Sequence, residues 1–335
     1  MDNGMKPRDR VLAALNRKPL DRPPVVCFTQ SATVDQMDAV GVYWPDAHTD
    51  PEKMATLAMA ANKVFGLESA RLPFCLTVEA EIMGAQVDLG KVDRTPMVKK
   101  HPYEASSEVE IPKDFASRGR AKVVIEATKI LKKKTEGKLP VVVGTTGPFT
   151  IAGHLVGTEN ILLWIITDPD SVHKFLKIAA EIEHQYVKAI AAAGADVIVM
   201  SDPSASTDML SGEMFDEFAA PYIKQAFSGI EAKRVLHICG DTTILLEHMM
   251  ATGVDGLSIE EKVVPEKAVE IVDNKVALIG NVGVVKPLLQ GTPDDVMRDA
   301  KRVAKAGFHL VAPGCGLAAR VPKNNIQALV KAVKG

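Results

Sequence analysis

Short apolar runs alternate with longer helical patterns along almost the whole of this 335-residue chain. The runs are rich in β-branched residues and end at turn residues, whereas the segments between them repeat apolar residues at helical spacing. This alternation is typical of a parallel sheet whose strands are joined by crossover helices. Eight runs are predicted as strands, at residues 24–28, 69–73, 141–145, 196–200, 234–237, 256–259, 276–279 and 309–311.

Between these runs the sequence predicts helices at residues 161–193, 211–228, 242–251, 265–272 and 293–306. The longest pattern contains Asp168-Pro169-Asp170, a helix-start signal in its interior. Eight strands with helices between them favour an α/β fold, a (β/α)8 TIM barrel formed as a single domain by residues 1–335. Residues 30–65 and 75–120 are less regular, and we expect them to form a helical N-terminal extension and an insertion over the mouth of the barrel.

The composition permits a large buried core and excludes several classes of function. Hydrophobic residues make up 47% of the chain and charged residues 24%, which is ordinary for a globular protein. A formal charge of −2 and a pI near 6.5 give no basic surface for nucleic acid. No stretch of 18 apolar residues predicts a membrane span, and residues 1–6 contain no apolar signal region. Four cysteines in this length fit a reducing compartment, so a cytoplasmic protein is expected.

Three side chains of the types that zinc prefers follow the predicted strands. His237 and Cys239 are two residues apart, so in an extended strand they face the same side, about 6 to 7 Å apart along the backbone. Cys315 follows a distant strand, in Pro313-Gly314-Cys315. Two ligands from one strand and a third from a distant strand leave one coordination position free, which is the layout of a catalytic rather than a structural zinc site.

Further polar residues follow other predicted strands. Asp202, Glu260 and Asn281 each lie at or just after a carboxyl end, and these ends converge on the mouth of a parallel barrel. Asp202 and Asn281 are therefore predicted to line the substrate pocket. For Glu260 two interpretations stay open: an oxygen ligand or catalytic group near the metal, or a charged residue that opens a loop.

The remaining cysteines and histidines have no ligand-like spacing. Cys27 and Cys75 are interpreted as core residues, because single cysteines are usually buried for packing. The glycine-containing loop at residues 144–149 lacks the Gly-Lys-Ser/Thr ending of a phosphate-binding loop, and its glycines instead allow close approach of a ligand or movement of a lid.

Taken together, these segments resemble the uroporphyrinogen decarboxylase superfamily over nearly the whole chain. The resemblance is carried by residues 7–16, 21–25, 76–81, 147–150, 201–203, 237–240, 280–282 and 313–315. Within the superfamily, the His-Cys-Cys trio is similar to the zinc ligands of the methylcobamide:coenzyme M methyltransferases of methylotrophic methanogens. Glu260 lies where the related cobalamin-independent methionine synthases place an acidic ligand.

The resemblance implies a TIM-barrel enzyme that moves a methyl group from a methylated corrinoid protein to the thiol of coenzyme M. It implies Zn2+ as cofactor, held by His237, Cys239 and Cys315, and methylcobamide as a methyl donor that a partner protein presents. The corrinoid is too large to enter a barrel alone, so a docking surface is expected around the mouth.

Three alternatives remain at this point. A uroporphyrinogen decarboxylase is disfavoured, because members with that activity carry Arg-Gln-Ala-Gly-Arg where residues 27–31 of this chain read Cys-Phe-Thr-Gln-Ser, without the arginines that hold substrate carboxylates. Another thiol, such as homocysteine, is a second acceptor to consider. A purely structural zinc is the third alternative, and it would require four firm protein ligands.

Overall fold

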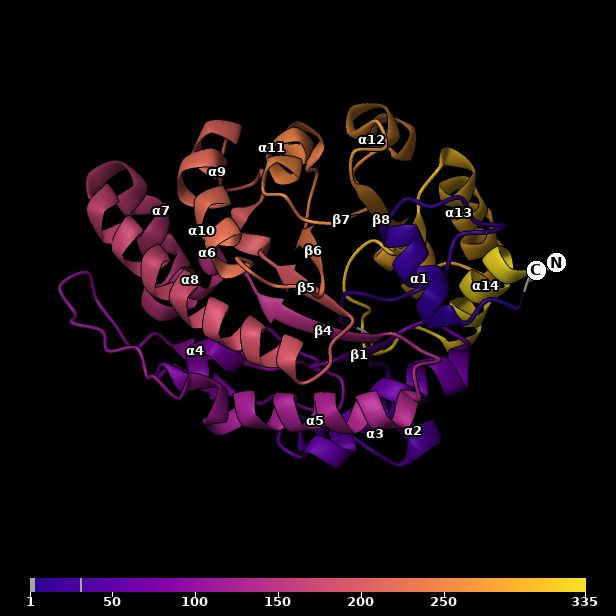
Figure 1. The fold of residues 1–335 in the computed structure, drawn as a ribbon, viewed down its shortest axis with the longest axis horizontal. Helices are drawn as coiled ribbons and strands as arrows, with labels where there is room; N and C mark the ends of the chain where they lie inside the picture. The colour runs from indigo at the N-terminus through magenta and orange to yellow at the C-terminus, as the bar shows by residue number, and fades with distance from the viewer. Residues whose placement is uncertain (1–3, 31) are drawn as a thin grey trace.

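The computed structural model describes residues 4–30 and 32–335; of the N-terminal stretch considered for a signal region, residues 1–3 lie outside this part. Seven parallel strands form one curled sheet, and helices lie around its outer face (Figure 1). In sheet order the strands are β1 (Ala70–Leu72), β4 (Val141–Thr146), β5 (Val197–Ser201), β6 (Lys233–Ile238), β7 (Gly256–Ile259), β8 (Ala277–Val282) and β9 (Leu310–Pro313). A separate antiparallel pair consists of β2 (Gln86–Asp88) and β3 (Met97–Lys100).

Seven of the eight predicted strands are confirmed, and the eighth, at residues 24–28, is not formed as a strand. Residues 24–28 make one isolated bridge, between Val25 and Val311 of β9. Pro23 and Pro24 supply no backbone N–H, which removes donors that a regular ladder would need. The prediction of a complete eight-stranded barrel is therefore not confirmed, although the curled parallel sheet is.

On the side facing β1, residues 24–28 are held by side-chain hydrogen bonds in place of a backbone ladder. The backbone N–H of Val25 donates to the Glu68 carboxylate at 2.9 Å, and that of Cys27 donates to the Ser69 hydroxyl at 3.1 Å. The backbone N–H of Glu68 also donates to the Val25 carbonyl at 2.8 Å. Residues 24–28 consequently lie between β9 and β1, the two edge strands of the sheet.

Helices connect the strands and pack around the sheet. They are α1 (Pro7–Leu15), α2 (Val34–Val40), α3 (Pro51–Ala60), α4 (Val78–Ile82), α5 (Gly119–Thr135), α6 (Pro148–Val156), α7 (Thr158–Thr167), α8 (Pro169–Ala192), α9 (Gly212–Phe218), α10 (Ala220–Ala226), α11 (Leu246–Ala251), α12 (Pro265–Val272), α13 (Pro293–Ala306) and α14 (Lys323–Lys334). Shorter helical turns are η1 (Asp46–His48), η2 (Ala61–Phe65), η3 (Phe115–Ser117), η4 (Pro203–Ala205), η5 (Thr243–Leu245) and η6 (Val284–Leu289).

The helices predicted at 265–272 and 293–306 are confirmed with their bounds, and two longer predictions are each divided. The helix predicted at 161–193 is interrupted at Asp168, whose backbone is not helical and whose side chain accepts the Ser171 N–H as the N-cap of α8. The pattern at 211–228 is divided between α9 and α10 at Ala219, two residues before Pro221. Proline explains both breaks, because it cannot donate to the preceding turn.

The core has two parts, one on each face of the curled sheet. Alternate strand residues such as Val142, Val235 and Ile279 fill the interior, and α1 adds Val11 and Leu15 to the same cluster. The outer part lies between the sheet and the surrounding helices. Because α1 and these apolar side chains occupy the amino ends of the strands, the polar strand-end residues are left at the carboxyl ends.

The N-terminal segments lie beside the sheet as well as near its ends. In residues 32–65, α3 packs against α5 and β1, and α2 packs against α3 (Figure 1). Residues 75–120 contain α4, the β2–β3 pair and η3. This packing does not confirm a lid over the mouth, so that role of the two segments, like the single-domain organisation, stays a prediction.

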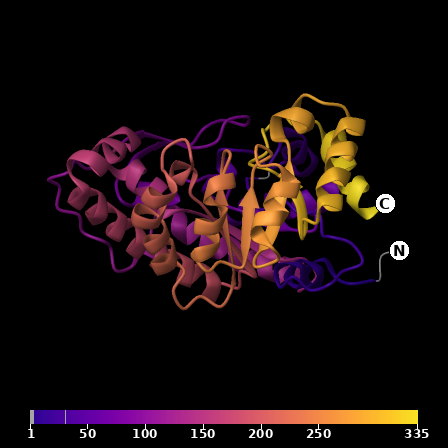
Figure 2. The ribbon, with the colours of Figure 1, turned by 90° about the horizontal axis from the view of Figure 1, so that it is seen from above.

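The α7 region and the C-terminal helices lie at opposite ends of the long axis of the molecule (Figure 2). Among the described residues, no single helix has the length and apolar composition needed to cross a membrane. Only α6 and α7 taken together meet both criteria, and this pair is bent by 101°.

Candidate metal centre

His237, Cys239 and Cys315 come together at the carboxyl ends of β6 and β9. The Cys239 Sγ lies 3.3 Å from the His237 Nε2 and 3.3 Å from the Cys315 Sγ. One ligand atom from each residue lies within 4.8 Å of the others, and this is the one such group of three among the described residues. The sequence spacing thus predicted a real spatial cluster.

The orientation of the His237 ring is fixed from the next strand. β6 pairs with β7 so that His237 lies opposite Ser258. The His237 Nδ1 is 3.0 Å from the Ser258 carbonyl oxygen and 3.1 Å from its hydroxyl. Because a carbonyl only accepts, Nδ1 carries the proton, and the lone pair of Nε2 is directed at the two sulfurs.

Cys315 is held through its backbone. The Thr29 hydroxyl donates to the Cys315 carbonyl at 2.8 Å, and the Leu317 N–H donates to the Gln30 carbonyl at 2.9 Å. A Cβ at Gly314 would lie 2.6 Å from a Glu261 carboxylate oxygen and 2.9 Å from the Glu261 nitrogen, so only glycine fits before Cys315. The segment that follows residues 24–28 therefore positions the third member of the trio.

The two thiols act on each other's protonation. Their mutual hydrogen bond lowers the pKa of Cys315 and raises the pKa of Cys239, while burial opposes ionisation of both. Cys315 is therefore the more acidic thiol of the pair, because the Cys239 S–H can donate to its thiolate.

The donor set fits zinc. One imidazole nitrogen and two sulfurs are the ligands of catalytic Cys2His sites, and two sulfurs on a tetrahedral zinc lie about 3.8 Å apart. The sulfurs here are 3.3 Å apart, so a small outward shift would accommodate the ion. A fourth ligand from the chain is absent from the group formed by the residues that the structure describes.

Glu260 lies beside the trio but outside it. Glu260 directly follows β7, and its carboxylate accepts a hydrogen bond from the backbone N–H of Gly240, the residue after Cys239. The Glu260 charge is one of the factors that raise the pKa of Cys239. The Glu260 carboxylate is therefore bonded to the residue next to Cys239, and its role as a metal ligand or as a base stays a prediction.

Asp202 is buried and fully engaged at the start of α6. Its carboxylate accepts the Phe149 N–H at 3.2 Å, and both the N–H and the hydroxyl of Thr150 at 2.7 Å. Burial raises the pKa of Asp202 to about 6, against these hydrogen bonds. The structure gives this residue a capping role, and its predicted contact with substrate stays untested.

Asn281 is also buried and joins β8 to the loop after β7. Its side-chain nitrogen donates to the Glu260 carbonyl at 3.2 Å and to the Val263 carbonyl at 2.7 Å. Its side-chain oxygen is buried without a hydrogen-bond partner among the described residues. Asn281 thus orders the loop that carries Glu260, and its substrate contact stays a prediction.

Sequence reasoning missed Thr29, Ser258 and Arg71 as residues near the site. Thr29 and Ser258 act through hydrogen bonds to Cys315 and His237, residues distant from them in the chain, and the sequence carries no signal for such bonds. Arg71 carries one: it is a charged residue in the centre of an apolar run, between Ala70 and Leu72.

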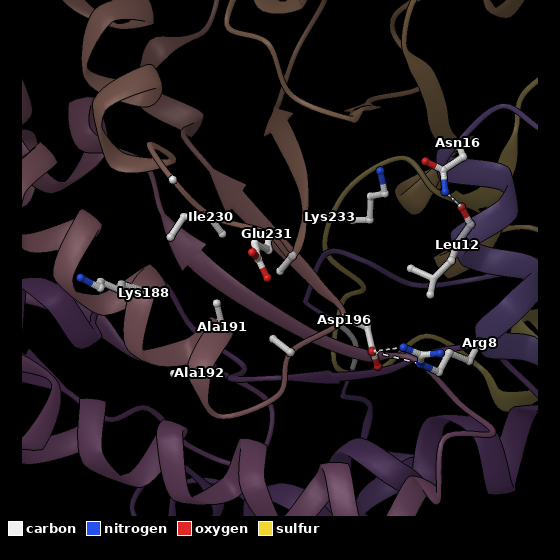
Figure 3. A pocket seen from close by; sticks show the side chains of 13 residues that line it. Arg8, Leu12, Asn16, Lys188, Ala191, Ala192, Asp196, Ile230, Glu231 and Lys233 are labelled. Carbon is white, nitrogen blue, oxygen red and sulfur yellow. Dashed lines mark hydrogen bonds and ion pairs between the residues drawn. The ribbon is translucent and has the colours of Figure 1, made fainter.

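A cavity of about 520 Å3 lies at the opposite end of the strands (Figure 3). It is lined by residues of α1, the end of α8 and the start of β6. The Arg8 guanidinium donates to the Asp196 carboxylate at 2.9 and 3.0 Å, and Lys132 donates to the same oxygen at 2.8 Å. Asp196 precedes β5, so this cavity is separated from the trio by the length of the strands.

Comparisons with known proteins agree over nearly the full length. The family profile described as Uroporphyrinogen decarboxylase (URO-D) matches residues 6–335. The chain is 39% identical over 335 residues to the Methylcobamide:CoM methyltransferase MtbA of Methanosarcina acetivorans, covering 98% of this chain and 97% of that protein. It is 39% identical over 327 residues to the Methylcobamide:CoM methyltransferase MtaA of Methanosarcina barkeri, covering 97% and 96%. A solved methyltransferase from Methanosarcina mazei superposes with a TM-score of 0.95 at 40% identity, covering 98% of each chain.

Proposed function

Because the chain belongs to the uroporphyrinogen decarboxylase family, we propose that it is the kind of member that its 39%-identical relatives are named for, a methylcobamide:coenzyme M methyltransferase. The observation that carries this proposal is the trio of His237, Cys239 and Cys315, whose donor atoms lie within 4.8 Å at the carboxyl ends of the strands. A decarboxylase acting on a polycarboxylate has no evident use for two thiols and an imidazole at this place.

In the proposed reaction the acceptor thiol loses its proton and its sulfur attacks the methyl carbon of the methylcobamide. A carbon–sulfur bond forms, the cobalt–carbon bond breaks, and its electron pair leaves with the cobalt. A zinc ion bound at the trio would lower the pKa of the acceptor thiol. Cys239 and Cys315 as thiolates balance the formal charge of the ion, so the acceptor sulfur stays electron-rich. His237 keeps one orientation through Ser258.

Glu260 is the residue that we propose to receive the thiol proton. Its carboxylate lies next to Cys239, at the Gly240 N–H, and is only partly buried. Asp202 and Asn281 are proposed to shape the pocket from β5 and β8, by fixing α6 and the loop after β7.

The proposed setting follows from the same chemistry. The methyl donor is carried by a methylated corrinoid protein, and the acceptor is coenzyme M, a small thiol. No part is proposed for nucleic acid or a membrane, and thiols that must stay reduced fit the cytoplasm.

Two measurements test the proposal. Metal analysis is expected to find about one zinc per chain, lost in Cys315→Ala and kept in Cys75→Ala, a buried cysteine outside the trio. Incubation with methylcobalamin and either coenzyme M or homocysteine, followed by the absorbance of cob(I)alamin, is expected to show transfer to coenzyme M. An active metal-free protein would contradict the zinc mechanism, and preference for homocysteine would contradict the acceptor.

A further inference from the structure

We infer that Arg71 binds the anionic end of the acceptor, so that a thiol bearing a sulfonate is held between Arg71 and the His237, Cys239 and Cys315 trio. This inference rests on the proposed function, because the acceptor class comes from there. Two observations single out Arg71: its side chain points into the curled sheet, and no carboxylate of the described residues pairs with its guanidinium.

Arg71 points into the interior of the curled sheet. Its neighbours Ala70 and Leu72 belong to the outer core, so the alternation along β1 directs Arg71 inward. Gly144 of β4 confirms the direction, since a Cβ built there would lie 2.1 Å from an Arg71 guanidinium nitrogen. Glycine at this position makes room for the guanidinium group.

The guanidinium of Arg71 is buried without an acidic partner. The residue is 2% exposed, one of its terminal nitrogens donates to the Pro73 carbonyl, and its Nε has no hydrogen-bond partner within residues 4–30 and 32–335. No carboxylate of the described residues forms an ion pair with it. A buried charge is costly unless an opposite charge accompanies it, and an arginine is not neutralised by losing its proton.

The other buried arginines of the described chain show what Arg71 lacks. Arg10 forms an ion pair with Asp21, and Arg120 forms one with Glu81 and also donates to Thr77. Both are anchored by carboxylates that belong to the protein. For Arg71 the equivalent anion has to come from outside, and the planar fork of its guanidinium matches the oxygens of a sulfonate or carboxylate.

Arg71 is also close to the trio. Residues 24–28 lie between β1, which carries Arg71, and β9, which precedes Cys315. On one side of this segment the Thr29 hydroxyl donates to the Cys315 carbonyl at 2.8 Å, and on the other the Cys27 N–H donates at 3.1 Å to the hydroxyl of Ser69, two residues before Arg71. A short acceptor with a thiol at one end and an anion at the other would therefore extend from the trio across the inner face of this segment to Arg71.

Substitution of Arg71 tests the inference with two thiols that differ in one group. Coenzyme M and 2-mercaptoethanol share the two-carbon thiol, but only coenzyme M carries a sulfonate. In Arg71→Gln the KM for coenzyme M should rise about 10- to 100-fold, the loss expected for a hydrogen-bonded charge, while the KM for 2-mercaptoethanol changes less than about twofold. Arg71→Lys should recover part of the loss, and the exposed Arg302→Gln should match the unchanged protein.

A binding measurement separates this inference from the proposed function. Ethanesulfonate, which has no thiol, should bind the metal-free protein in calorimetry, and Arg71→Gln should abolish the binding. Gly144→Ala keeps the charge but displaces the guanidinium, so it should weaken ethanesulfonate binding as well and serves where Arg71→Gln fails to fold. If the protein transfers methyl groups to no thiol, the proposed function fails while the ethanesulfonate result still decides the role of Arg71.

Three outcomes would overturn the inference. They are unchanged ethanesulfonate binding in a folded Arg71 variant, an equal rise in KM for both thiols, and tighter binding of propionate than of ethanesulfonate. The second would give Arg71 a structural role, and the third would assign the site to a carboxylate.

Discussion

At the scale of single residues, hydrogen bonds from neighbouring strands decide what the site can do. Ser258 determines which nitrogen of His237 faces the sulfurs, and Thr29 holds the backbone of Cys315. Both bonds join groups of the protein alone, and loss of such supporting contacts typically costs 10- to 100-fold in metal affinity. The ligands could be predicted because a two-residue spacing is local in sequence, whereas their supports join residues up to 286 positions apart.

His48 gives a prediction about acid stability. It is buried in a stack with Trp44, at a ring-centroid distance of 5.3 Å, and neither ring nitrogen has a hydrogen-bond partner in the described part of the chain. Burial lowers the pKa of His48 to about 3, with a smaller contribution from the positive charge of Arg120. In the unfolded chain the pKa is near 6.5, so the unfolded state gains the proton first and stability is lost as the pH falls below that value.

Replacing His48 by Phe should remove this sensitivity without breaking a hydrogen bond. Between pH 7 and pH 5 the unfolding free energy of the unchanged protein should fall by about 2 kcal/mol relative to that of His48→Phe. Urea unfolding of the metal-free proteins at both pH values measures the difference and avoids any effect of metal loss. If the unfolding free energies of the two proteins differ by the same amount at pH 7 and at pH 5, His48 takes up a proton in the folded state as readily as in the unfolded state.

At the scale of elements, the predictions succeeded where one segment determines its own structure. Residues 265–272 and 293–306 are helices as predicted, and α13 has a capping box between Thr292 and Asp295 that is readable from the sequence. Residues 24–28 were predicted as a strand from their apolar character, but two of their backbone N–H groups donate to the side chains of Glu68 and Ser69 instead of to a strand backbone. These hydrogen bonds depend on a segment more than 40 residues away, so no local sequence pattern predicts them.

The junction of β5 and α6 supplies a prediction that separates two roles of Asp202. The carboxylate accepts three hydrogen bonds from Phe149 and Thr150 at the first turn of α6, as an N-cap does. Asp202→Ala should therefore lower the unfolding free energy by about 2 kcal/mol, the upper range for loss of a cap. Asp170→Ala, an exposed acid in the first turn of α8, should cost much less. Unchanged stability combined with a raised KM would instead support a direct substrate contact.

At the scale of the whole molecule, the two ends of the curled sheet have different characters. Apolar side chains and α1 fill the interior toward the amino ends. The cavity at that end is lined by Arg8 and Asp196, which pair with each other. At the carboxyl ends lie the trio and Glu260, and the guanidinium of the buried Arg71 lies beside Pro73 and Gly144. The alternation of strands and helices predicted this polarity, because parallel strands present all their carboxyl ends to one side.

Exposed apolar residues surround the same end. Met209, Ile244, Val264 and Val285 follow β5, β6, β7 and β8, and their exposed fractions range from 39% to 68%. Each would be better placed in a core, and together they occupy successive loops around the trio. A partner that presents a methylated corrinoid to the trio must cover these loops, so we expect them to form part of its docking surface.

Ile244, the most exposed of the four, is the residue to test. Ile244→Asp should raise the KM for the methylated corrinoid protein about 10-fold, as loss of one interface anchor does, and leave transfer from free methylcobalamin unchanged. Ile166→Asp is the matched control, because Ile166 is equally apolar and 75% exposed but lies on α7, at the left end of the molecule in Figure 1, beyond α9. A parallel loss with both donors would place the effect of Ile244 on the site itself, and a loss in Ile166→Asp alone would move the docking surface to α7.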